Sequence, residues 1–206
     1  LNSGAAGGTI TFKDLLNGNQ TLGLTAGTGN IDFDGVVGGV TPLGAVTVNS
    51  AGNVTADAAF SAASFRQVAG SGTTTFTGAL ATTAAAAVEV DGTNFDFNST
   101  VNLTLGSLDV DATGTVRFNG VVTTQAAAAG LVTITNGGVL TITAGGDMNL
   151  EGAFLQDGAG TISTAGDITT TNDAITFTDE VTLTGAVALN SGAAGGTITF
   201  KDLLNG

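Results

Sequence analysis

The sequence predicts an all-β fold, a parallel β-helix whose chain winds into stacked turns, or rungs, of about 21 residues. Three observations predict it. Short runs alternate apolar and polar residues, phenylalanine recurs at a nearly constant spacing, and one 18-residue segment occurs twice. Alternation with a period of two is typical of strands with one buried face, and recurrence at a fixed spacing is typical of solenoids.

The phenylalanine spacing defines the rung. A spacing of about 21 residues, single or doubled, separates the successive members Phe12, Phe33, Phe76, Phe97 and Phe118. Phe177 and Phe200 are separated by a similar interval. Within the doubled interval, Val54 and Ala56 keep the pattern with alanine in place of the ring. The interval from Phe118 to Phe177 leaves room for about three rungs, although the pattern is less clear there.

These phenylalanines, with the residue two positions before each, are expected to point inward and to stack on successive rungs. Burial of one such ring stabilises a fold by roughly 1.5–3 kcal/mol, so the column should fix the register. The predicted core column comprises Ile10, Phe12, Ile31, Phe33, Phe76, Phe95, Phe97, Val116, Phe118, Ile175, Phe177, Ile198 and Phe200.

Further short strands fill each rung, at residues 22–24, 46–48, 88–90, 103–105 and 132–134. Residues that tolerate positive φ are expected at the corners after the phenylalanine strands, namely Asp14, Gly35, Gly78, Ser99, Gly120 and Asp179. A β-sandwich or a propeller is the alternative fold. Antiparallel strands do not need the same side chain at one rung offset, and propeller blades run to about 40 residues.

The longer repeat predicts a rod. Residues 1–18 are identical to residues 189–206, an offset of 188, which corresponds to about nine rungs. We therefore predict one continuous solenoid over residues 1–206, with one repeat unit at 1–188 and the first rung of the next copy at 189–206. Nine rungs at ~4.8 Å give a unit about 43 Å long. Because the chain starts at Leu1 rather than Met, it reads as a window of a longer tandem filament.

The composition argues against several classes of binding partner. The net charge of −13, from 17 acidic and four basic side chains, predicts repulsion of nucleic acid and anionic lipid. The apolar runs are far shorter than the roughly 18 residues of a membrane helix, so no membrane insertion is expected. The chain has no Cys, which excludes disulfides and thiolate metal sites without fixing the compartment.

Catalytic and metal chemistry are not expected. Asp109 and Asp111 put two carboxylates on one outer face and are calcium candidates, but a solvated acidic surface without cofactor is the expected state. The pairs Asp32 with Asp34 and Asp109 with Asp111 are the available acid and base groups, and the chain has no His, Cys, Tyr or Trp. We predict that it is not an enzyme; a polysaccharide-active β-helix is the least favoured alternative.

The outward residues test a surface-binding role. Ranks of Thr-x-Thr on a flat solenoid face are typical of ice-binding proteins, and Thr9 with Thr11 begins such a rank. Asp32, Asp96 and Arg117 interrupt it with charges, and Asp96 is expected to lie beside Arg117 on the adjacent rung. An ice- or glycan-binding solenoid is the second reading.

Residues 8–12 and the run 25–39, TAGTGNIDFDGVVGG, resemble the repeat regions of very large bacterial surface exoproteins, of the filamentous-haemagglutinin and autotransporter adhesin types. The resemblance covers essentially the whole chain and implies a right-handed β-helical rod, export across the outer membrane, and adhesion, biofilm or surface coating. It transfers no functional residue. The predicted function is thus a structural or adhesive module of an extracellular, cell-surface fibre, with self-association, lateral fibre contacts or surface glycans as its partners.

Overall fold

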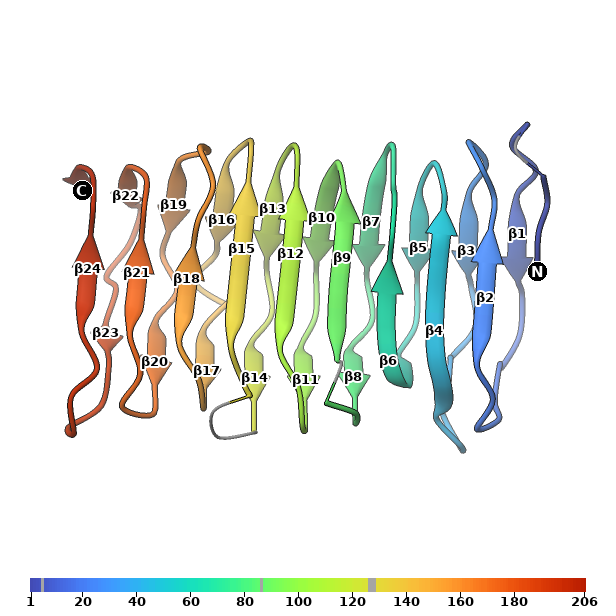
Figure 1. Cartoon of the computed structure of the whole chain (residues 1–206), viewed down its shortest axis with the longest axis horizontal. Coiled ribbons are helices and arrows are strands. Elements are labelled where there is room, and N and C mark those ends of the chain that lie inside the picture. The colour runs from blue at the N-terminus through green and yellow to red at the C-terminus, as the bar shows by residue number, and fades with distance from the viewer. Residues whose placement is uncertain (5, 86, 126–128) are drawn as a thin grey trace.

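The chain forms a right-handed parallel β-solenoid of about nine turns in a computed structural model that describes residues 1–4, 6–85, 87–125 and 129–206. Front strands run up and rear strands run down as the chain passes from N to C, from right to left, which is the sense of a right-handed coil (Figure 1). The described residues contain no α-helix and so none that is long and apolar enough to cross a membrane.

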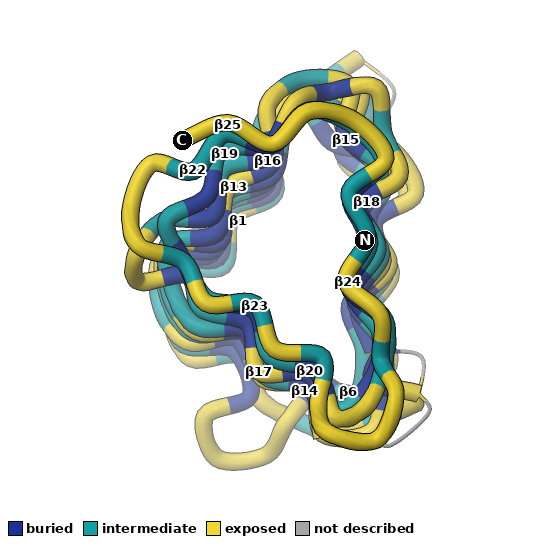
Figure 2. The backbone as a smooth tube through the Cα atoms, turned by 90° about the vertical axis from the view of Figure 1, so that its left-hand side faces the viewer, coloured by how far each residue is buried: buried dark blue, intermediate teal, exposed yellow. Residues whose placement is uncertain are grey.

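The strands lie on three faces, which we name front, upper rear and lower rear from their positions in Figure 1; the first two turns reach the lower rear face through isolated bridges at Leu16 and Val37. The upper rear face is a ten-stranded sheet, and the other two faces belong to a 15-stranded sheet. The long strand β6 (Phe60–Gln67) joins these two faces, because it pairs with β8 on the lower rear and with β4 and β9 on the front. Seen along its axis, successive turns of the coil overlie one another around a common interior (Figure 2).

The strand bounds follow the predicted alternation. The upper rear strands are β1 (Ile10–Phe12), β3 (Ile31–Phe33), β5 (Val54–Ala56), β7 (Thr73–Phe76), β10 (Asn94–Phe97), β13 (Val116–Phe118), β16 (Leu140–Ile142), β19 (Ile162–Thr164), β22 (Val181–Leu183) and β25 (Leu204–Asn205). The front strands are β2 (Leu22–Thr25), β4 (Leu43–Ser50), the second half of β6, β9 (Val88–Gly92), β12 (Leu108–Ala112), β15 (Val132–Asn136), β18 (Phe154–Gln156), β21 (Ile175–Phe177) and β24 (Ile198–Phe200). The lower rear strands are the first half of β6, β8 (Leu80–Thr82), β11 (Val101–Leu103), β14 (Val122–Thr124), β17 (Met148–Leu150), β20 (Ile168–Thr170) and β23 (Leu189–Asn190).

The predicted core column is confirmed from Ile10 to Phe118. Its rings stack face to face where they are adjacent: Phe97 lies 4.9 Å from Phe118 and 5.7 Å from Phe76, with interplanar angles of 3° and 2°. These three rings are buried. One ladder on the upper rear face joins Phe12, Phe33, Ala56, Phe76, Phe97 and Phe118, and the neighbouring ladder joins Ile10, Ile31, Val54, Thr74, Phe95 and Val116.

The alanine in the column is compensated from another face. Ala56 leaves space between Phe33 and Phe76, and Phe60 and Phe65 of β6 fill it. Phe60 meets Phe33 edge to face at 5.3 Å, and Phe65 meets Phe76 edge to face at 5.2 Å. Edge-to-face contacts are favourable for aromatic pairs, so the aromatic core is continuous although the ladder is not.

Beyond Phe118 the predicted burial of Ile175 and Phe177 is confirmed, but the prediction that they continue the same column is wrong. The upper rear ladder continues through Leu140 and Ile142 of β16, not through a phenylalanine. The four remaining predicted members, Ile175, Phe177, Ile198 and Phe200, lie on the front face in β21 and β24. The physical reason is uneven rung length. Successive upper rear register partners from β13 onward are Val116, Leu140, Ile162 and Val181, and the steps between them shorten along the chain. The stretch from Phe118 to Phe177 therefore covers two full turns and two further faces rather than three turns.

The 188-residue offset consequently does not hold a whole number of turns. Eight turns along the upper rear ladder carry the chain from Ile10 to Val181, and Ile198 lies two faces further along the coil. The offset therefore equals about eight and two-thirds turns. Residues 189–206 therefore lie on different faces from residues 1–18, and the offset of about nine rungs predicted from the sequence is not a whole nine turns.

The predicted corner residues are needed for a different reason from the one expected. Gly35, Gly78 and Gly120 do not have positive φ. Instead the backbone of the preceding rung passes so close that a Cβ on Gly78 would lie 2.2 Å from the carbonyl carbon of Ala58. Asp14, Ser99 and Asp179 are also outside the positive-φ region. Glycine is therefore required at positions 35, 78 and 120 by the close approach of stacked rungs, and not at the corners of Asp14, Ser99 and Asp179.

A buried pair of amides lies on the front face in the later rungs. Asn136 and Gln156 are fully buried, and the Gln156 Nε2 donates to the Asn136 Oδ1 at 2.9 Å. The Gln156 Oε1 accepts from the backbone N–H of Thr178 at 3.0 Å, while the Asn136 Nδ2 donates to the Gly160 carbonyl at 2.9 Å. The amide pair thus satisfies corner backbone groups that would otherwise be unpaired inside the rod.

Candidate functional site

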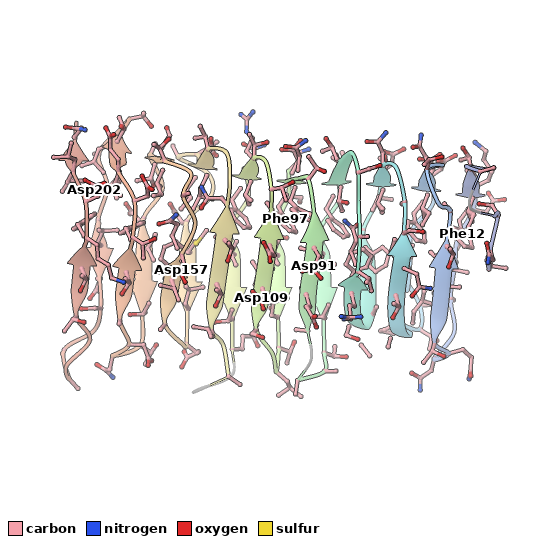
Figure 3. The ribbon with its side chains drawn as sticks, turned by 45° about the horizontal axis from the view of Figure 1, so that its top comes forward. Phe12, Asp91, Phe97, Asp109, Asp157 and Asp202 are labelled. Carbon is pink, nitrogen blue, oxygen red and sulfur yellow. The ribbon has the colours of Figure 1, made fainter. Side chains whose placement is uncertain are left out.

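Four acidic side chains gather on the front face of the solenoid. Outward positions of β9 and β12 place Glu89, Asp91, Asp109 and Asp111 in two adjacent rows, and we name these four residues the acidic ladder. Asp109 is the register partner of Glu89, and Asp111 is the register partner of Asp91. Asp91 and Asp109 both lie on this face in Figure 3.

The geometry of the ladder follows from the strand pattern. Leu108 and Val110 are buried, so the aspartates between and after them must point outward. The preceding rung has the same pattern, with Val88 and Val90 buried. The sequence analysis singled out Asp109 and Asp111 but not their partners on β9, although the same apolar-acidic alternation at residues 88–91 was a usable signal.

Like charges at this spacing disfavour ionisation. Partial burial, followed by the charges of Asp111 and Glu89, raises the pKa of Asp91 above its usual value. Partial burial, followed by the charges of Glu89, Asp91 and Asp111, raises the pKa of Asp109. Desolvation and neighbouring negative charges both disfavour a carboxylate.

A cation borders the ladder. Arg66, the register partner of Glu89 on β6, places its Nε 3.2 Å from the Glu89 Oε1. Both side chains are about half exposed, at 46% and 52%, so the pair contributes little to stability. On the opposite side of the ladder, the register partners are the neutral residues Thr133 and Thr135.

A shallow depression of about 330 Å³ adjoins the ladder where β6, β9 and β12 end, and Asp91, Asp111, Thr93 and Thr113 line it. Carboxylates and hydroxyls are ligands for hard cations. Within the described part of the chain, however, no group of three or more acidic side chains is arranged to hold a metal ion. The calcium hypothesis at Asp109 and Asp111 stays a prediction.

The second acid pair lies on the upper rear face. The Asp34 Oδ2 accepts a hydrogen bond from the Lys13 Nζ at 2.7 Å, and this bond and the charge of Asp34 raise the pKa of Lys13. Asp32 is the outward residue of β3, and partial burial, then the charges of Asp34 and Asp57, raise its pKa. The Asp34 carboxylate is therefore engaged in an ion pair, and the absence of catalysis stays a prediction.

The outward row of the upper rear face matches the sequence analysis. Asp96 and Arg117 are register partners, as predicted, and the Arg117 Nε donates to the Asn119 Oδ1 at 2.9 Å. The outward row runs Thr11, Asp32, Thr55, Thr75, Asp96, Arg117, Thr141, Ser163, Thr182 and Asn205. Charges therefore interrupt this row, which does not form an uncharged lattice.

An uncharged row on the lower rear face was not identified from the sequence. The row runs Ser61, Ala81, Asn102, Thr123, Asn149, Thr169 and Asn190. Along this row, a groove of about 240 Å³ crosses three rungs at β14, β17 and β20. Its lining combines apolar surface, including Leu150, with the hydroxyls, amides and one carboxylate of Thr123, Gln125, Asn149, Glu151, Thr169 and Thr171. Uneven spacing along the chain, widest between Thr123 and Asn149, hid this row in the sequence.

No family model, curated protein or solved structure matches this chain.

Proposed function

We propose that the chain is a structural segment of a long β-solenoid fibre built from tandem 188-residue copies, with an adhesive role at a bacterial cell surface. One observation carries this proposal: the segment at 1–18 recurs at 189–206, and it stacks on a neighbouring rung in both places. A repeated sequence that stacks as a rung wherever it occurs can extend a solenoid without limit. The resemblance to large bacterial surface exoproteins supports the adhesive and extracellular parts of the proposal.

The surface chemistry is consistent with a spacer rather than a reaction centre. With 17 acidic residues, the rod surface is strongly negative, and like charge keeps such rods apart in solution. The outward positions of the three faces are occupied mainly by threonine, asparagine and aspartate, while the apolar side chains of the strands fill the interior.

Chains with one, two and three copies of the unit test the proposal. Each added copy should lengthen the rod by about 40 Å, because about eight and two-thirds turns stack at ~4.8 Å. Negative-stain electron microscopy measures this length. Particles that stay the same length, or that form separate beads joined by linkers, would contradict the continuous rod.

The proposed cell-surface location is tested on the bacteria that make the protein. Antibodies against the chain should label intact bacteria, and protease added outside the cells should remove the label. The denatured native chain should be several times the mass of the 19.9 kDa segment. Labelling that appears only after lysis would contradict a surface location.

Glycan binding is a second candidate, favoured by the groove on the lower rear face, which combines polar groups with apolar surface. Threonine hydroxyls, amides and the Glu151 carboxylate offer donors and acceptors that match sugar hydroxyls. A glycan array with the intact chain tests this, and Glu151→Gln should weaken any binding, while Glu89→Gln on the front face should not. An ice-recrystallisation assay on the same sample tests the uncharged row against ice.

A further inference from the structure

The two copies of the 18-residue segment lie on different faces. Three parts of the segment each lie one face earlier along the coil in the second copy than in the first. The middle part is Ile10–Phe12 on the upper rear face in the first copy and Ile198–Phe200 on the front face in the second. The flanking parts shift in the same way. Asn2 of the first copy pairs with the front face, whereas its equivalent Asn190 lies on the lower rear face. Leu16 pairs with the lower rear face, whereas its equivalent Leu204 lies on the upper rear face.

The local packing of the segment is the same on either face. Phe12 stacks on Phe33 at 5.0 Å with an interplanar angle of 5°. Phe200 stacks on Phe177 at 5.1 Å with an angle of 11°. Each face is a parallel sheet with its apolar side inward, so an Ile-Thr-Phe strand meets equivalent surroundings on any of them.

The second copy presents an uncovered apolar surface. Leu183, Val187, Leu189, Ile198, Phe200 and Leu204 line a depression of about 300 Å³. Among the described strands, β23, β24 and β25 each have a partner on one side only. An unpaired parallel edge above an apolar interior favours addition of a further strand.

The first copy shows what covers this surface. Residues 22–37 follow the first copy after three residues and stack on it, with Ile31 on Ile10 and Phe33 on Phe12. Val37 bridges to Leu16, and Asp34 pairs with Lys13. Because residues 189–206 are identical to residues 1–18, the same continuation fits them in the same register.

We propose that residues 19–41 of a following copy cover residues 189–206 in this register, and that successive copies are therefore rotated by one third of a turn. This rests on the proposed function, in which copies follow one another. Each copy advances about eight and two-thirds turns, so a given face returns after three copies and 26 turns. At ~4.8 Å per turn the true axial repeat is about 125 Å, in place of the single unit length of about 43 Å expected from the sequence. The acidic ladder then points in three directions around the rod.

The first arm of the test uses the 206-residue chain and asks which face Thr176 occupies. Spin labels on Arg117→Cys and Thr182→Cys should be close, since these residues lie three rungs apart in one row, about 14 Å at ~4.8 Å per rung. Labels on Arg117→Cys and Thr176→Cys should be further apart, because Thr176 lies on the front face. A whole number of turns per copy would reverse this order, and that result would overturn the rotation. All three sites are outward, and circular dichroism checks that the labelled chains keep their strands.

The second arm uses a chain with residues 1–188 twice followed by residues 189–206. Labels on Thr176 of the first copy and on Thr199, which is Thr11 of the second copy, should interact as strongly as labels on Thr11 and Asp32 within one copy, because each pair consists of register partners. No interaction at the junction would overturn the continuous rod and the rotation with it. Interaction at the junction together with a reversed first arm would overturn the rotation alone.

Discussion

The rungs from Ile10 to Phe118 and the rungs after Phe118 differ in how their buried columns are built. The first region stacks aromatic rings on the upper rear face, as Phe76, Phe97 and Phe118 do. Beyond Phe118, Leu140 and Ile142 continue that face, while the stacked rings of Phe177 and Phe200 and the buried amide pair of Asn136 and Gln156 lie on the front. The comparison teaches that a face can be followed along the sequence only where one residue type marks it.

The largest expected loss of stability comes from a substitution in the aromatic column. Phe97→Asp should lower the free energy of unfolding by about 4–5 kcal/mol or prevent folding, because it buries a carboxylate without a partner between Phe76 and Phe118. Urea denaturation followed by circular dichroism measures the loss. The outward neighbour gives the control, since Asp96→Asn should change stability by no more than about 0.5 kcal/mol. Equal midpoints for Phe97→Asp and wild type would contradict the buried column.

The next largest loss of stability is expected from a substitution in the buried amide pair of Asn136 and Gln156. Gln156→Ala should destabilise by about 2–4 kcal/mol, because the Thr178 N–H and the Asn136 amide lose their buried partner. The same denaturation measurement applies, with Gln125→Ala on the exposed surface as the control. If both variants lower the free energy of unfolding equally little, the buried amides do not stabilise the later rungs.

A smaller loss of stability is expected from a substitution at a corner glycine, and it tests why glycine is needed there. Gly78→Ala should cost about 1–3 kcal/mol, since its Cβ would collide with the backbone of the preceding rung. Gly23→Ala is the matched control: nothing lies within 4 Å of the added Cβ, its φ is not positive, and the change should be neutral or stabilising by about 0.4–1 kcal/mol. Thermal melts of the two variants decide whether close approach, rather than backbone flexibility, requires glycine.

The smallest effect concerns the acidic ladder on the surface of the aromatic region. Asp109→Asn should stabilise by about 0.5 kcal/mol at pH 7, because it removes a like charge opposite Glu89. The pKa values of Asp91 and Asp109 are raised above the 3.8 of an isolated aspartate, so between 3.8 and the raised values the folded chain binds more protons than the unfolded chain. Wild-type stability should therefore rise as the pH falls from 7 through this window, and the gain from Asp109→Asn should shrink. A gain that grows on acidification would contradict the repulsion.

The sequence by itself determined the parallel solenoid, the inward and outward residues, and the register from Ile10 to Phe118. It could do so because a phenylalanine ladder at a nearly constant spacing marks one face, and a two-residue alternation fixes which side chains are buried. It also located half of the acidic ladder, at Asp109 and Asp111. The tertiary structure added Glu89 and Asp91, because contacts between rungs depend on which strands are neighbours.

Only the tertiary structure decided the faces of the later rungs. Ile175 and Phe177 have the same pattern as Ile31 and Phe33, yet they lie on the front rather than the upper rear. The pattern specifies burial of one side of a strand, and all three faces offer that burial equally. Which face a strand occupies depends on the summed lengths of the corners before it, and corners of glycine, threonine and asparagine vary in length without changing the alternation that the sequence displays.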